Sequence, residues 1–220
     1  MARSFGPLIL PSCLVCGALL ATAAAALHPA LTGDGAAQLA AIAHSAWWRA
    51  IHWAFLFGFP LSLAGLVGLA AEQTGTPGER AARAGVVVAT FAYACWTVIV
   101  AFMAGTGWTL ARQVATATSG PDAASAVFMF EMAQPFALVT QRVAGFALGV
   151  ATALLGWGIG SGNALPRWLG SGGVAAGVGA MLLALSFRED TRADQAAFVL
   201  PVLWQLGTGA VLLRRRSAAS

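Results

Sequence analysis

The chain has 220 residues, of which 59% are hydrophobic and 9% are charged, and its formal net charge is +4 at pH 7. Soluble domains carry roughly 45–50% apolar and about 25% charged residues, so this composition leaves too few polar side chains to cover a water-facing surface. It excludes an ordinary soluble protein and predicts an integral membrane protein that forms one helical domain over residues 1–220.

Six apolar windows are each close to the roughly 20 residues that an α-helix needs to cross about 30 Å of hydrocarbon. They predict an all-α, polytopic bundle of about six transmembrane helices. The first window also resembles a cleavable signal peptide, because a leucine-containing run leads into the alanine-rich segment 21–26, and we favour its retention. The windows cover residues 6–27, 50–71, 85–105, 137–160, 168–187 and 196–213.

The arginines indicate the orientation of this bundle. The chain contains no lysine, and many of its arginines fall at the termini and in alternate short connections, which six spans would place on one side. By the positive-inside rule that side is cytoplasmic, so we expect both termini in the cytoplasm and a bacterial inner-membrane location. The arginines concerned are Arg3, Arg80, Arg83, Arg167 and Arg214–Arg216.

Two connections on the predicted outer side are longer than simple turns. In residues 28–49, Asp34 is placed to cap a helix that could continue into the second span. In residues 106–136, we expect an interfacial helical turn and then a helix that bends at Pro135. Nearly all structure outside the lipid should therefore lie on this outer side.

Small residues predict close contacts between helices. Gly173 and Gly177 form a G-x-x-x-G pair in the fifth span, and Gly65 and Gly68 lie in the second. The inner halves of the spans are mostly alanine, glycine, valine and leucine, so we expect them to pack helices without orienting a ligand.

Several catalytic classes are excluded. Without lysine there is no retinal or pyridoxal Schiff base and no P-loop. The sequence contains no H-E-x-x-H, no G-x-S-x-G and no acidic pair inside a span, so we expect no enzymatic activity. Cys13, Cys16 and Cys95 lie in apolar runs and give no disulfide framework. Cys13 and Cys16 form a C-x-x-C, but no group nearby lowers a thiol pKa, so we interpret this pair as packing residues.

The three histidines, His28, His44 and His52, all fall on the predicted outer side. His28 ends the first span and His52 lies about one turn inside the second, so adjacent antiparallel helices bring these two to similar depth. The pair could ligate a b-type haem axially or form a small metal site. The favoured alternative is an aromatic belt, in which histidines and tryptophans sit at the membrane boundary without a ligand.

Arg142 lies about five residues inside the outer end of the fourth span, where a charge needs a partner or must reach the interface. We expect it to pair with Glu131, Gln134 or an acid of the 188–194 loop. Its guanidinium could also bind an anionic group through a bidentate fork. Together these polar residues predict a ligand site that opens outward between spans one, two and four, formed by His28, His52, Glu131, Gln134 and Arg142.

The segment WWRAIHW at residues 47–53 and the turn PRWLG at residues 166–170 carry a resemblance. With the six-span layout, they resemble uncharacterised bacterial six-helix membrane-protein families, which implies the fold and no activity. We predict a non-enzymatic accessory or interaction subunit with a polar, ligand-capable outer face. Its partners would be the lipid bilayer and other membrane subunits, without nucleic acid.

Two other functions stay open. The chain could be a membrane redox protein that binds haem b near His28 and His52. It could also be a small-solute transporter that uses helix kinks at Pro60 and Pro201.

Overall fold

The computed structural model describes residues 6–117, 120–186 and 192–218, and within these ranges every regular element is a helix. Six helices of this described part are long and apolar enough to cross a membrane, which confirms the predicted six-helix membrane class by length and composition. The elements are α1 (Gly6–Leu27), α2 (Gly35–His44), α3 (Trp48–Ala71), α4 (Glu79–Phe102), the π-helical η1 (Met103–Gly107), α5 (Trp108–Thr116), α6 (Pro121–Ser161), α7 (Arg167–Ser186) and α8 (Arg192–Ala218).

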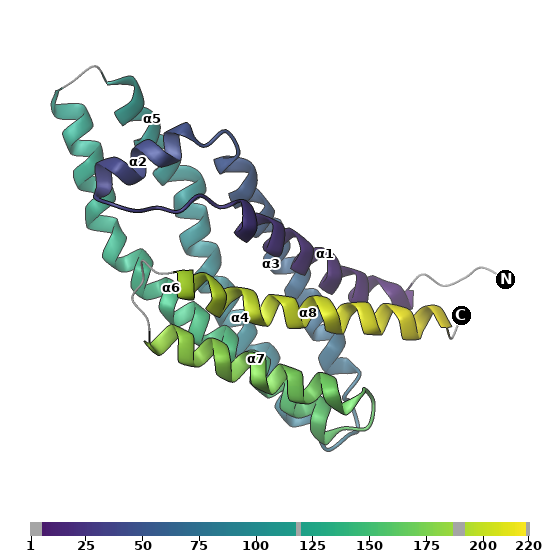
Figure 1. Cartoon of the computed structure of the whole chain (residues 1–220). Coiled ribbons are helices and arrows are strands. Elements are labelled where there is room, and N and C mark those ends of the chain that lie inside the picture. Colours follow the sequence, from purple (N-terminus) through teal and green to yellow (C-terminus); the bar gives the residue numbers. More distant parts are fainter. Residues whose placement is uncertain (1–5, 118–119, 187–191, 219–220) are drawn as a thin grey trace.

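The long helices run side by side, and the two ends of the bundle differ (Figure 1). At one end, the end of α8 meets both neighbouring turns, because Arg216 pairs with Glu72 and Arg215 donates to the carbonyl oxygen of Ala164 at 2.5 Å. We call this the arginine end; it holds the turns at 72–78 and 162–166. At the opposite end lie α2, α5 and residues 121–136 of α6, which we call the cap.

Glycines allow the helices to approach closely, as predicted. A β-carbon at Gly177 of α7 would lie 2.4 Å from the carbonyl oxygen of Gly149 on α6. One at Gly65 of α3 would lie 2.3 Å from the β-carbon of Leu14 on α1. Real β-carbons do not come so near other atoms, so these positions require glycine for the observed packing.

Two helices extend beyond their predicted spans. The chain stays helical from Glu79 to Thr116, because η1 joins α4 to α5 without a break, whereas the sequence predicted a span at 85–105 and a separate turn. Helix α6 has 41 residues and continues through Pro135. At 1.5 Å per residue it is about 61 Å long, roughly twice what a hydrocarbon layer of about 30 Å requires.

The cap has an apolar core of its own, which explains why these helices continue. Leu39 of α2, Leu110 of α5 and Phe130 of α6 are buried against one another in a cluster separate from the main core. Asp34 caps α2 as predicted, since its Oδ1 accepts the N–H of Ala37 at 2.9 Å. However, α2 does not continue into α3; it ends at His44 and α3 begins at Trp48.

Candidate functional site

A cavity of about 630 Å³ lies next to the cap, among residues of α1, α3, α4, α6, α8 and the segment that follows α1. This volume lies within the range of small-molecule sites. Its walls include α1, α3 and α6, which correspond to the spans one, two and four between which the sequence predicted a site. The polar side chains in its lining are His28, Thr32, Gln38, His52, Gln134, Gln141 and Gln195, with Trp96 contributing an indole N–H.

His28 and His52 meet in this cavity, with ring centroids 5.3 Å apart and planes inclined by 57°. The Nδ1 of His28 lies 2.8 Å from the carbonyl oxygen of Pro29, and the Nδ1 of His52 lies 2.7 Å from that of Trp48. A carbonyl oxygen can only accept, so each Nδ1 of a neutral ring carries the proton. Each Nε2 therefore keeps a lone pair for a ligand.

Trp48 holds the two histidines together. Its ring centroid lies 5.1 Å from that of His28 and 4.2 Å from that of His52. Trp48 is fully buried, and its indole N–H donates to the carbonyl oxygen of Met103 at 3.0 Å. An aromatic belt does not describe these residues, since His52 is only 2% exposed, whereas Trp47 and Trp53 are exposed as belt residues would be.

His28 lies just beyond the membrane-spanning part of α1. Burial lowers the pKa of its imidazole below the ordinary value of 6.5, although the contact with the carbonyl of Pro29 opposes this shift. Desolvation disfavours the charged form, so the ring is neutral at neutral pH. His28 can then act as an acceptor or a metal ligand.

Aromatic rings form the floor of the cavity. The ring centroid of Phe198 on α8 lies 5.0 Å from that of Trp96 on α4 and 5.8 Å from that of Phe55 on α3. The Nε1 of Trp96 is buried and has no hydrogen-bond partner among the described residues. The floor thus presents a large apolar surface and one unused N–H donor.

The structure also contains a buried polar pair that the sequence prediction missed. The hydroxyl of Tyr93 donates to Oε1 of Gln205 at 2.9 Å, and both side chains are buried between α4 and α8. The inner parts of the spans are therefore less uniformly apolar than expected. Tyr93 is the single tyrosine of the chain, and this, with a glutamine inside a span, was the available signal.

Of the two predicted site residues Glu131 and Gln134, only Gln134 lines the cavity. The carboxylate of Glu131 accepts the N–H of Gly35 at 3.1 Å, at the N-terminus of α2, where a helix favours negative charge. Glu131 is not in the cavity lining and instead attaches α2 to α6. Gln134 does line the cavity, and its amide donates to Gln38, so it joins the site to α2.

Arg142 is half-buried on α6 and is not in the cavity lining, although its neighbour Gln141 is. Because α6 is continuous, Arg142 lies about 16 Å along the helix axis from Glu131, which rules out the predicted pairing with that residue. The predicted acidic partners Glu189 and Asp190 lie outside the described residues. A pairing of Arg142 with that loop stays a prediction.

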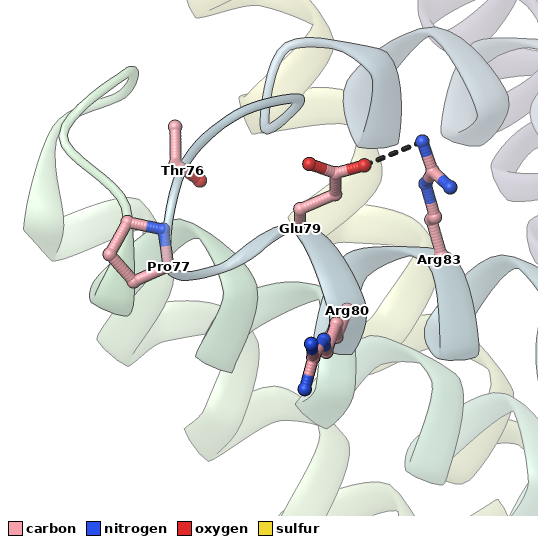
Figure 2. Close-up of a pocket in the computed structure, with 5 residues that line it drawn as sticks. All are labelled: Thr76, Pro77, Glu79, Arg80 and Arg83. Atoms are coloured by element: carbon pink, nitrogen blue, oxygen red, sulfur yellow. Dashed lines mark ion pairs between the residues drawn. The ribbon is translucent and has the colours of Figure 1, made fainter.

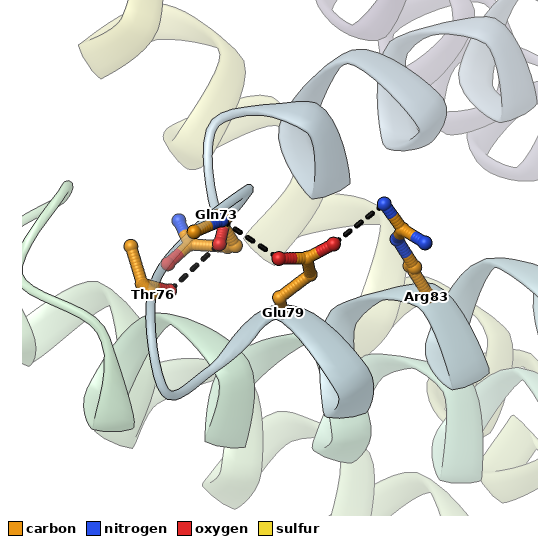
Figure 3. A network of polar contacts seen from close by, with 5 residues as sticks. Gln73, Thr76, Glu79 and Arg83 are labelled. Atoms are coloured by element: carbon orange, nitrogen blue, oxygen red, sulfur yellow. Dashed lines mark hydrogen bonds and ion pairs between the residues drawn. The ribbon is translucent and has the colours of Figure 1, made fainter.

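A second hollow, of about 490 Å³, lies at the arginine end and is lined by Thr76, Pro77, Glu79, Arg80 and Arg83 (Figure 2). Two of its charged residues, Glu79 and Arg83, belong to a network of polar contacts at the turn between α3 and α4 (Figure 3). Glu79 accepts the N–H of Gly75 at 2.7 Å and pairs with Arg83 at 2.5 Å. Since the carboxylate of Glu79 already has two partners within the protein, we interpret this network as structural.

Within the described part of the chain, no group of three or more His, Cys, Asp and Glu side chains is placed to hold a metal ion. The three cysteines are not joined in disulfides. Comparison of the chain with protein-family models, curated proteins and solved structures finds no match. The resemblance to bacterial six-helix membrane families therefore stays a prediction.

Proposed function

We propose that this chain is a non-enzymatic integral membrane protein that holds a small amphipathic molecule in the cavity beside the cap, as an accessory or interaction subunit of a bacterial inner membrane. The observation that carries the proposal is the cavity itself, which has the volume of a small-molecule site and joins polar side chains to an aromatic floor. We expect any partner subunit to bind the outer face that carries the cap and this cavity.

The chemistry of the lining defines the kind of ligand. The Nε2 atoms of His28 and His52 offer acceptors, while the amides of Gln134 and Gln141 offer both donors and acceptors. Phe55 and the other rings of the floor would cover an apolar body. A molecule with one polar head and an apolar ring or chain satisfies both parts, and the described lining contains no carboxylate for acid–base catalysis.

The geometry favours simple binding over the two alternative functions. Two imidazoles on opposite sides of a haem iron have ring centres roughly 6.4 Å apart, since each metal–nitrogen bond is about 2.0 Å. The observed 5.3 Å between His28 and His52 is too short for that arrangement. Pro60 and Pro201 lie inside continuous α3 and α8, so neither creates the broken helix typical of transporters.

A pair of neighbouring substitutions on α6 tests the proposal. Leu138 lines the cavity, whereas Val139 is 60% exposed on the outside of the bundle. We expect Leu138→Trp to fill the cavity and Val139→Trp to leave it open. Native mass spectrometry of protein extracted from its membranes should then show a bound small molecule in the wild type and in Val139→Trp, but not in Leu138→Trp.

Two results would count against the proposal. One is a wild-type protein that carries no small molecule after extraction from native membranes. The other is a Leu138→Trp variant that retains the molecule. An absorption spectrum of the same samples would identify haem directly if it were the occupant.

A further inference from the structure

We propose that His28 and His52 together bind one late first-row transition-metal ion through their Nε2 atoms. This inference rests on the proposed function, because the ion would be the polar anchor of the same cavity. His28 directly follows the last residue of α1 and His52 lies near the start of α3, so one ion would also join these two parts of the chain.

The hydrogen bonds of the two rings prepare them for coordination. Each Nδ1–H is fixed on a backbone carbonyl, that of Pro29 for His28 and that of Trp48 for His52. Metal-bound histidines commonly donate their other N–H to a carbonyl or carboxylate, which fixes the tautomer and the ring orientation. Both rings already hold the tautomer that leaves Nε2 free to bind a metal.

The distance between the rings fits a shared ion. With a metal–nitrogen bond of about 2.0–2.1 Å, the centre of a coordinated imidazole lies about 3.2 Å from the metal. For two rings whose Nε2 atoms bind the same ion, ring centres 5.3 Å apart correspond to a nitrogen–metal–nitrogen angle of about 110°. This is the angle of a tetrahedral site, which Zn²⁺ adopts in most proteins.

The ligand set indicates the class of ion. Neutral imidazole suits zinc, copper, nickel and cobalt, whereas magnesium and calcium require several oxygen ligands. The described lining supplies no carboxylate beside His28 and His52. Among the described residues no third His, Cys, Asp or Glu is grouped with the pair, so two protein ligands would leave the remaining positions to water or to the bound molecule.

His44 provides a matched control histidine. Its Nδ1 bonds the carbonyl of Ala40, four residues earlier, at 2.7 Å, which is the same local arrangement as in His52. Yet His44 is exposed on α2 and does not line the cavity. The anchored Nδ1 alone therefore does not make a site; the proposal depends on the pairing of two rings.

The test uses the full-length protein purified in detergent and stripped of metal. Zn²⁺ is titrated and counted by elemental analysis, and Co²⁺ reports the geometry by its absorption spectrum. We expect one ion per chain, with the strong visible absorption of four-coordinate Co²⁺. His28→Gln and His52→Gln should each weaken binding at least about tenfold, while His44→Gln should bind as the wild type does.

A second measurement needs no substitution, which matters because His52 is buried and its variant could misfold. Cu²⁺ bound to the wild-type protein is examined by pulsed electron paramagnetic resonance, which counts coordinated imidazoles. Two imidazoles on one ion support the proposal. Only one coordinated imidazole, no saturable binding at one ion per chain, or an equal loss in His44→Gln overturns it.

These outcomes separate the metal site from the proposed function. If Leu138→Trp excludes the small molecule but the wild type binds no metal, the cavity holds a ligand and the metal proposal is wrong. If the metal binds between two histidines but no small molecule is ever retained, the metal proposal stands and the proposed function is wrong.

Discussion

The surroundings of a histidine, rather than its place along the helix, distinguish His52 from His44. Both rings bond a carbonyl four residues earlier, but only His52 packs on the buried indole of Trp48 and faces His28. Trp48 is in turn held by the carbonyl of Met103, at the start of the π-helical segment. Irregular π-turns are frequently found at functional sites, and this one positions a wall of the cavity.

The first prediction concerns the pH dependence of stability at His28. Burial lowers the pKa of this ring in the folded protein below 6.5, whereas the unfolded chain has an ordinary histidine. Between these two pKa values the unfolded state binds more protons, so the free energy of unfolding decreases as the pH falls through 6.5. We expect the Tm of the metal-free protein to fall from about pH 7.5 to about pH 5.5, and His28→Gln to reduce that slope.

The control for this pH profile is His44→Gln, which changes an exposed histidine. It should leave the slope as in the wild type. An equal slope in His28→Gln and the wild type would show that His28 is not the titrating group.

At the scale of helices, hydropathy predicted the spans well. The helix expected before Pro135 is the first part of α6, whereas the continuity of α4 with α5 was not expected. The first window, 6–27, coincides with α1, and the second begins two residues after α3 does. Helix α6 begins at Pro121, well before the hydropathy window at 137–160, because Ala126 and Phe130 are buried in the core of the cap. That core joins residues distant in the sequence, which a local hydropathy window cannot register.

The candidate site was predictable only in the part that depends on where the spans begin and end. The depths of His28 and His52 follow from span boundaries, and their meeting is confirmed by the ring contact. The contact of Tyr93 with Gln205 depends instead on which faces of α4 and α8 meet. Nothing in the spacing of these residues determines those faces.

The second prediction uses two glycines one turn apart on α6. A β-carbon at Gly156 would lie 2.5 Å from the backbone nitrogen of Val174 and 2.7 Å from the carbonyl oxygen of Gly170, both on α7. A β-carbon at Gly160 would meet nothing within 4 Å. We expect Gly156→Ala to destabilise the bundle by about 1–3 kcal/mol, because backbone rather than a flexible side chain must move.

Thermal unfolding of the purified variants measures this difference. Gly160→Ala should unfold at the same temperature as the wild type or slightly higher, since alanine is the better helix former. If Gly156→Ala were as stable as Gly160→Ala, the close approach of α6 and α7 would be incorrect.

For the molecule as a whole, the arginine end and the cap end have different chemistry. A hydrocarbon layer of about 30 Å takes up about 20 helical residues, so a span that ends at Ser161 reaches back to about residue 142. Helix α7 agrees with this limit, because Ala184 near its end lies beside Gly145. On this basis we expect Arg142 at the membrane boundary, where its charge costs little, and the cap outside the lipid.

The third prediction is the orientation of the bundle in the membrane. Arg80 and Asp122 are both exposed, and they lie at the arginine end and in the cap, respectively. In a background with the three native cysteines replaced, single cysteines at these positions are treated with a membrane-impermeant maleimide on intact spheroplasts.

Arginine-rich loops are retained in the cytoplasm, so we expect labelling at position 122 in intact spheroplasts and at position 80 only after permeabilisation. A cysteine at Trp157, which is 65% exposed within the span of α6, should resist labelling in both conditions because lipid covers it. Labelling of position 80 from outside would show that the bundle has the opposite orientation. The end that holds the histidine cavity would then face the cytoplasm.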